Sequence, residues 1–135
     1  MKLPAGKYYI GDPCYVIDSD NWGEFLDSFW VLDNIRYIDR NGGIFDFDGY
    51  ACCAFYTLYG DGQYEASNGA MLGVDAAMIG AIPLVLCTRG DMNGPDSDGT
   101  VVEFHEPFEC ARDYDGLLHF GNVTVMTGEE NGDSY

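Results

Sequence analysis

The chain has 135 residues, of which 47% are hydrophobic and 15% aromatic, and this content predicts one folded domain rather than a disordered chain. Its 23 acidic and 6 basic residues give a formal net charge of −17. This charge repels polyanions, so it argues against direct nucleic-acid binding and against an anionic membrane surface, and it favours a basic protein surface or a cation. An acidic surface that serves only solubility is the alternative.

The glycines and cysteines indicate the class of fold and the compartment. Eighteen glycines predict many tight turns, which is typical of short strands. The five cysteines form no Cys-x-x-Cys pair, and with only two histidines they argue against structural zinc, so no structural metal and no cofactor is predicted. Cys52 and Cys53 are neighbours, so an extended strand would place them on opposite faces. We find no signal peptide and no apolar run of about 20 residues, which together predict a reducing, cytoplasmic setting and no membrane.

The first predicted element is a hairpin around Gly11-Asp12-Pro13-Cys14. Residues 7–10 and 15–17 are rich in tyrosine and β-branched side chains, so they are predicted to be paired strands. Glycine, aspartate and proline each favour a turn for a different physical reason. The turn would place one carboxylate and one thiol at the edge of a sheet.

A helix is predicted over residues 22–32. Its apolar side chains recur with helical spacing and form one stripe: Trp22, Phe25, Leu26, Phe29 and Trp30. Asn21 and Glu24 are three residues apart and resemble a capping box. We expect this helix to lie across a sheet.

From residue 35 the apolar period falls to two. Residues 35–39 and 43–47 are predicted to form a hairpin around the Asn41-Gly42 turn. The nearly continuous apolar run 50–59 predicts a central strand, and a Gly-Asp-Gly turn joins it to a further strand at 63–66.

The next segment mixes helix and strand signals. Asp75 is predicted to cap a single helical turn at 76–79. Residues 84–88 are predicted to be a buried strand, and 89–99 a loop because of their glycine, aspartate, asparagine and proline content.

The last third of the chain predicts one long strand at 100–110 and a hairpin of 117–120 with 123–126. Residues 1–126 are expected to form the single domain, and 127–135 an acidic, disordered tail. The predicted class is α+β and β-dominated: a bent antiparallel sheet or partly open barrel of about eight to ten short strands with one amphipathic helix packed on it.

Three turn aspartates are the first candidate site: Asp12, Asp61 and Asp75. Their carboxylates would bind a hard cation if the loops share one end of the sheet. The alternative is that each aspartate only stabilises its own turn or helix cap.

A second possibility is a metal- or cysteine-dependent hydrolase. Its catalytic candidates are Asp12, Cys14 and His105, with His119 as another base for the thiol. The negative field of the protein opposes thiolate formation, and no hydrolase signature surrounds Cys14.

A third possibility is a protein that sequesters a small signalling nucleotide. Tyr15, Tyr59 and Tyr64 would stack on a base, with Asp61 and Asp75 completing the predicted ligand set and glycine-turn amides holding phosphate. The arginines to test are Arg36, Arg40, Arg89 and Arg112. The net charge opposes such a ligand.

Three motifs together resemble a group of small uncharacterised proteins of bacteriophages and bacteria. They are Gly-Asp-Pro-Cys-Tyr-Val at 11–16, Tyr-Gly-Asp-Gly-Gln-Tyr at 59–64, and Gly-Val-Asp-Ala-Ala-Met-Ile-Gly-Ala-Ile-Pro at 73–83. The resemblance covers roughly residues 5–88. It implies a phage or prokaryotic origin and a compact β-rich fold, and it transfers no catalytic residue.

The leading hypothesis is therefore a small acidic binding protein of phage type in the cytoplasm of a bacterial host. Small acidic phage proteins often inhibit host defence factors, so the resemblance makes a host protein with a basic surface the expected partner. Electrostatic complementarity would drive the contact. The nucleotide-binding protein and the hydrolase remain alternatives, and the oligomeric state stays open.

Overall fold

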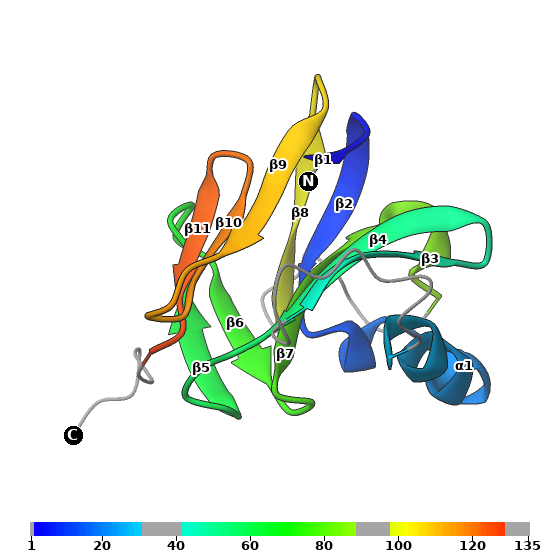
Figure 1. The fold of residues 1–135 in the computed structure, drawn as a ribbon, viewed down its shortest axis with the longest axis horizontal. Coiled ribbons are helices and arrows are strands. Elements are labelled where there is room, and N and C mark those ends of the chain that lie inside the picture. Colours follow the sequence, from blue (N-terminus) through cyan, green and yellow to red (C-terminus); the bar gives the residue numbers. More distant parts are fainter. Residues whose placement is uncertain (1, 31–41, 89–97, 129–135) are drawn as a thin grey trace.

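The protein is α+β and β-dominated, as expected (Figure 1). The computed structural model describes residues 2–30, 42–88 and 98–128. The strands in these ranges are β1 (Lys2–Leu3), β2 (Gly6–Gly11), β3 (Gly42–Phe47), β4 (Tyr50–Tyr56), β5 (Gly62–Glu65), β6 (Met71–Val74), β7 (Met78–Pro83), β8 (Gly99–Phe104), β9 (Phe108–Arg112), β10 (Leu117–Phe120) and β11 (Val123–Met126). The helices there are α1 (Ser19–Trp30) and the short 3-10 helices η1 (Pro13–Tyr15) and η2 (Leu84–Leu86).

The described strands form antiparallel sheets, and none of these sheets closes into a barrel. The central sheet has the order β3-β4-β7-β2-β8, a second has the order β1-β9-β10-β11, and β5 pairs with β6 alone. A single bridge between Ala66 and Val125 connects the end of β5 to β11. The second sheet and the β5–β6 hairpin therefore form one side of the molecule (Figure 1).

The central sheet is buried on both faces. Tyr8 and Cys53 point to a core that the central sheet shares with the second sheet and the β5–β6 hairpin. Tyr9 and Cys52 point to a core on the opposite face, which the sheet shares with α1. This alternation follows from the two-residue period of a strand. The predicted placement of the two adjacent cysteines on opposite faces is confirmed.

Helix α1 covers one face of the central sheet through aromatic contacts. Phe25 and Phe29 are fully buried, and both pack edge-on against Phe45, with ring centroids 5.4 Å apart. The predicted apolar stripe is thus confirmed for these two positions. The cap is one turn earlier than predicted, because Asp18 rather than Asn21 accepts a backbone hydrogen bond, from the N–H of Asn21 at 3.0 Å.

The predicted hairpin of residues 7–10 with 15–17 is wrong. β2 pairs with β7 and β8 instead, and the chain turns away through η1. The Asp12 side chain caps η1 and Pro13 occupies its first turn, so the backbone curls into helix before a second strand can begin. The apolar Val16 and Ile17 are buried in the core beneath α1.

Of the two hairpins predicted after α1, the first falls partly outside the described residues and the second is wrong. Residues 35–39 and the Asn41 turn lie outside the described residues, and β3 pairs with β4 through a two-residue turn. Asp48 and Gly49 in this turn have φ of 52° and 83°, as the twist of a hairpin favours. The central position of β4 is confirmed. β5 pairs with β6 and not with β4, so the hairpin predicted there is wrong.

The predicted helical turn at 76–79 is also wrong, because Met78 already begins β7. Residues 75–77 form the β6–β7 turn, in which Ala77 has φ of 59°. The strand predicted at 84–88 is the 3-10 helix η2, and most of the predicted loop 89–99 lies outside the described residues. Leu86 from this segment is buried in the core between α1 and the central sheet.

The predicted strand at 100–110 is two strands in different sheets, β8 and β9, with Pro107 in the turn between them. The β10–β11 hairpin is confirmed, with Leu117 opposite Met126. The fold extends beyond the predicted boundary at 126, since Thr127 is fully buried. Residues 129–135 of the predicted tail lie outside the described part.

Candidate functional site

The three turn aspartates of the sequence converge on the β6–β7 turn. Oδ2 of Asp12 accepts hydrogen bonds from the backbone N–H groups of Asp75 and Ala76, at 2.7 and 2.6 Å. Oδ1 of Asp61 accepts one from the N–H of Ala77 at 2.9 Å. The loops after β2 and β4 are thus joined to the same short turn.

Asp12 is the buried centre of this arrangement, with 0% of its surface exposed. Its other oxygen, Oδ1, accepts the N–H of Cys14 at 2.9 Å, so the carboxylate meets three backbone donors. Burial raises the pKa of Asp12, and the hydrogen bonds from Ala76, Cys14 and Asp75 oppose that rise. Both oxygens are occupied by the backbone, so in this structure the residue organises the turn rather than facing a ligand.

Beside the turn lies a shallow acidic hollow of about 380 Å³. The described residues that line it are Tyr15, Asp61, Gly62, Gln63, Gly73, Val74, Asp75 and Asp98, and none of them is a lysine or arginine. We refer to this set as the acidic hollow. Three carboxylates around one open space favour a cationic group, such as a lysine or arginine side chain.

The walls of the hollow are fixed by local contacts. The Tyr15 hydroxyl donates a short hydrogen bond to Oδ2 of Asp75, and burial together with this bond raises the pKa of Tyr15. Gly73 donates its N–H to the backbone oxygen of Asp98 at 3.1 Å. A Cβ added at Gly73 would lie 2.6 Å from Oδ1 of Asp98, so the Asp98 carboxylate rests directly against the strand backbone.

Asp98 is the member of this site that the sequence analysis missed. The composition of residues 89–99 predicts only a polar loop there, and a signal in favour of Asp98 is the glycine at position 73. A strand glycine often marks a place where another group approaches the backbone closely.

The remaining predicted ligand residues are not in the acidic hollow. Tyr64 is fully buried and its hydroxyl donates to the backbone oxygen of Gly60 at 2.5 Å, so its ring is not on the surface. Tyr59 is 54% exposed but lies outside the described lining of the hollow. Of the five predicted ligand residues, the structure thus brings Tyr15, Asp61 and Asp75 together.

The predicted thiol–histidine pair is not assembled. Cys14 follows the Gly11 end of β2, whereas His105 follows Phe104, which pairs with Gly6 at the other end. The six residues of β2 span roughly 17 Å at the rise of a strand. His119 lies in the other sheet, where its Nε2 is 3.3 Å from Oδ2 of Asp113.

Of the four arginines named as tests of nucleotide binding, Arg36, Arg40 and Arg89 lie outside the described residues. Arg112 donates its Nε–H to the backbone oxygen of Tyr56 at 2.9 Å and is partly buried. Within the described part, no group of three or more histidine, cysteine, aspartate or glutamate side chains is arranged to hold a metal ion.

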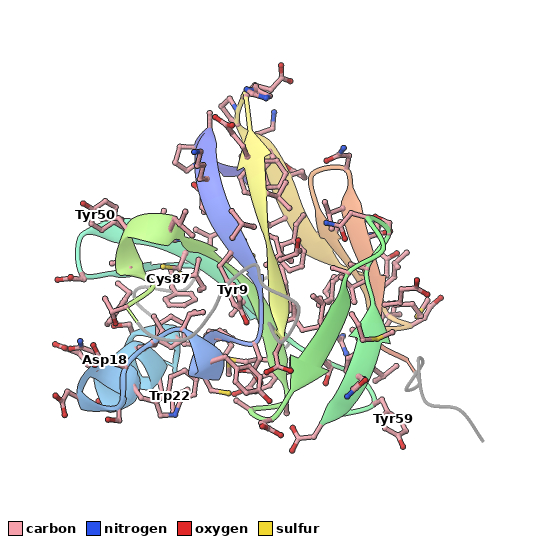
Figure 2. The ribbon with its side chains drawn as sticks, turned by 180° about the vertical axis from the view of Figure 1, so that it is seen from behind. Tyr9, Asp18, Trp22, Tyr50, Tyr59 and Cys87 are labelled. Atoms are coloured by element: carbon pink, nitrogen blue, oxygen red, sulfur yellow. The ribbon has the colours of Figure 1, made fainter. Side chains whose placement is uncertain are left out.

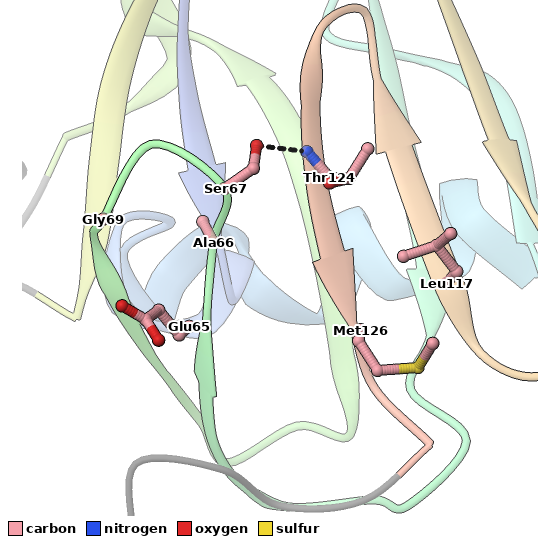
Figure 3. A pocket seen from close by; sticks show the side chains of 7 residues that line it. All are labelled: Glu65, Ala66, Ser67, Gly69, Leu117, Thr124 and Met126. Atoms are coloured by element: carbon pink, nitrogen blue, oxygen red, sulfur yellow. Dashed lines mark hydrogen bonds between the residues drawn. The ribbon is translucent and has the colours of Figure 1, made fainter.

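A second hollow, of about 370 Å³, lies where β5 and β11 diverge (Figure 3). The Thr124 N–H donates to Oγ of Ser67 at 2.9 Å and closes one end of it. Glu65 and Met126 lie along the two separating strands (Figure 3). Its lining contains none of the residues predicted from sequence, and a single carboxylate gives it no strong charge.

Because two buried or partly buried groups have raised pKa values, we expect the free energy of unfolding to fall at alkaline pH. Burial raises the pKa of Tyr8 from 10.0 to about 12 and that of Cys87 from 9.0 to about 12. In the unfolded chain these groups ionise first, so the stability that they contribute is present below pH 9 and is lost between pH 9 and 12. Denaturant titrations across this range will measure it.

The matched variant is Tyr8→Phe. It removes the hydrogen bond from the Tyr8 hydroxyl to the backbone oxygen of Pro4, 2.8 Å away, and lowers stability at neutral pH. It should also make the decline between pH 10 and 12 shallower than in the parent protein. A free energy of unfolding that stays constant up to pH 12 would contradict the prediction.

No family model, curated protein or solved structure matches the chain. No helix in the described ranges is long and apolar enough to cross a membrane.

Proposed function

We propose that this protein is a binding protein that engages a basic protein surface, and that the acidic hollow receives a lysine or arginine side chain of that partner. The observation that carries the proposal is the convergence of Asp61, Asp75 and Asp98 around one open space, with no lysine or arginine in the described lining. Such a site attracts a cationic side chain and orients it by charge-assisted hydrogen bonds.

The wider surface supports the same partner. Asp12 is the buried exception among the described carboxylates, Asp18 and Asp98 are half-buried, and the others are exposed. With a net charge of −17, the molecule presents a negative field that accelerates association with a positive surface. The resemblance to phage proteins makes a host factor, inhibited by this contact, the partner that we propose.

The first experiment identifies the partner and its salt dependence. Immobilised protein is incubated with a bacterial lysate at low salt, eluted by raising the salt, and the eluate is identified by mass spectrometry. We expect a protein with a basic surface whose affinity falls steeply as salt rises, because exposed charges are screened within about 8 Å at physiological ionic strength. A salt-insensitive complex would count against the proposal, and so would a nucleotide retained by the protein in native mass spectrometry.

A charge-matched pair of variants then tests the acidic hollow. Asp75→Asn with Asp98→Asn removes two charges from the hollow, whereas Glu103→Gln with Glu106→Gln removes two exposed charges at the opposite end of β8. We expect the first pair to raise the Kd of the purified partner roughly tenfold and the second pair to change it far less, as calorimetry can measure. Equal effects would show that only the overall charge matters.

A further inference from the structure

One end of the molecule exposes three large apolar side chains on two neighbouring segments. Leu58 and Tyr59, in the loop after β4, are 52% and 54% exposed, and Tyr114, in the turn between β9 and β10, is 97% exposed. Tyr59 projects outward from the body of the protein (Figure 2). We call these three residues the aromatic end.

The two segments are held together through Thr127, which is fully buried. Its backbone oxygen accepts the N–H of Tyr59 at 2.8 Å, and its Oγ accepts the N–H of Leu58 at 3.2 Å. On the other side, the Thr127 N–H donates to the backbone oxygen of Gly116 at 3.0 Å. The exposed side chains therefore stand on backbone that is already ordered.

The loop after β4 has a second internal support. Oγ of Thr57 donates to the backbone oxygen of Gly60 at 2.6 Å and accepts the Gly60 N–H at 3.0 Å, and the Tyr64 hydroxyl donates to the same oxygen. Because the backbone of this loop is already held by hydrogen bonds, it loses little conformational entropy when Leu58 and Tyr59 bind a partner. Rigid tyrosines are for this reason frequent anchors at protein interfaces.

Carboxylates surround the aromatic end. Asp113 and Asp115 flank Tyr114 in the turn, and both are exposed. Asp61, which lines the acidic hollow, follows Tyr59 by two residues. Two basic side chains near this turn in the sequence already have partners: Nε of Arg112 donates to the backbone oxygen of Tyr56, and Nε2 of His119 lies 3.3 Å from Oδ2 of Asp113.

We propose that the aromatic end anchors the basic partner next to the acidic hollow, and that the segment it recognises carries apolar side chains between its arginines or lysines. This inference rests on the proposed function and locates the apolar part of its interface. An apolar centre within a charged rim is the usual anatomy of a protein interface. The charge of −17 on every copy opposes a second copy of this chain as the occupant.

The protein itself offers a matched control. Tyr50 is 44% exposed, and beside Val85 it lines a different hollow that also contains Lys7. Tyr50 and Tyr59 lie far apart on the molecule (Figure 2). Removal of either ring deletes a tyrosine side chain of similar exposure, 44% for Tyr50 and 54% for Tyr59, but only Tyr59 belongs to the aromatic end.

The test uses two synthetic peptides of equal length and equal arginine content, one with serine spacers and one with leucine and tryptophan spacers. We expect the apolar peptide to bind the full chain roughly tenfold more tightly than the serine peptide by calorimetry. Tyr59→Ala or Tyr114→Ala should abolish most of this difference, while Tyr50→Ala should preserve it. Circular dichroism of each variant verifies that the fold is retained.

Each other outcome has a distinct meaning. If both peptides bind equally, with steep salt dependence and no effect of Tyr59→Ala or Tyr114→Ala, the inference fails and the proposed function stands. If neither peptide binds at low salt, both fail. A dimer in analytical ultracentrifugation that Tyr114→Ala dissociates would overturn the inference in favour of self-association.

Discussion

Replacing Asp12 with alanine is expected to lower the free energy of unfolding by about 3 kcal/mol or more, because three backbone N–H groups lose their acceptor. The affected donors belong to Cys14, Asp75 and Ala76, and the carboxylate that they surround is fully buried. Water cannot easily replace an acceptor at such a position, so most of the cost is retained. Denaturant titration at neutral pH measures the change.

Two further variants give this prediction its control. Asp12→Asn keeps one oxygen but turns an amide NH₂ toward donors, so it should remain strongly destabilising. Asp61→Ala removes one hydrogen bond, to the Ala77 N–H, from an exposed carboxylate and should cost about 1 kcal/mol or less. If Asp12→Ala and Asp61→Ala cost the same, the central role of Asp12 in the β6–β7 turn would be refuted.

The second large effect is expected from Gly80→Ala in the middle of the central sheet. A Cβ at Gly80 would lie 2.4 Å from the backbone oxygen of Cys53, on the neighbouring strand β4. Gly80 is paired on its two sides with Ala54 and Gly11, so neither β4 nor β2 can move away without breaking its own pairs. We expect a loss of about 3 kcal/mol or more in the free energy of unfolding, or no soluble protein.

The same substitution at Gly23 is the matched control. Gly23 lies within α1, and a Cβ there meets no atom within 4 Å. Alanine is the better helix former, so Gly23→Ala should raise the free energy of unfolding by about 0.5–1 kcal/mol. A stabilising Gly80→Ala would contradict the close packing of β4 against β7.

These predictions bear on the proposed interface, because the β6–β7 turn carries one wall of the acidic hollow. Asp12 accepts hydrogen bonds from the backbone N–H groups of Asp75 and Ala76, and the Tyr15 hydroxyl donates to the Asp75 carboxylate. Loss of Asp12 should therefore weaken binding together with stability, whereas Asp98→Asn should weaken binding alone. A comparison of melting temperature with affinity separates the two roles.

Local residue patterns were sufficient for part of this structure. The helical spacing of Phe25 and Phe29 indicated α1 and its buried face, and the two-residue period placed Cys52 and Cys53 on opposite sides of β4. The β10–β11 hairpin followed from the two short strand patterns at 117–120 and 123–126. In each case the residues that determine the feature are close together along the chain, so the feature can be predicted from the sequence.

The same local patterns do not predict which strands pair with one another. β2 resembled half of a local hairpin, yet its partners β7 and β8 come from much later in the chain. Residues 76–79 had the composition of a helical turn, but the pairing of Met78 with Tyr56 and of Ile79 with Phe55 extends this segment into β7. Ladder hydrogen bonds and burial on both faces outweighed the local helix preference.

The sequence by itself therefore determined the α+β class, the buried face of α1, the acidic character of the surface and the identity of Asp12, Asp61 and Asp75 as turn residues. Only the tertiary structure decided that their loops meet at one turn and that both carboxylate oxygens of Asp12 accept backbone hydrogen bonds. It also decided that Asp98 lines the acidic hollow together with Asp61 and Asp75. It also buried Tyr64 and left Tyr59 and Tyr114 exposed. The physical reason is that burial and hydrogen-bond partners depend on which distant strands pair, whereas period, charge and turn preference are properties of neighbouring residues.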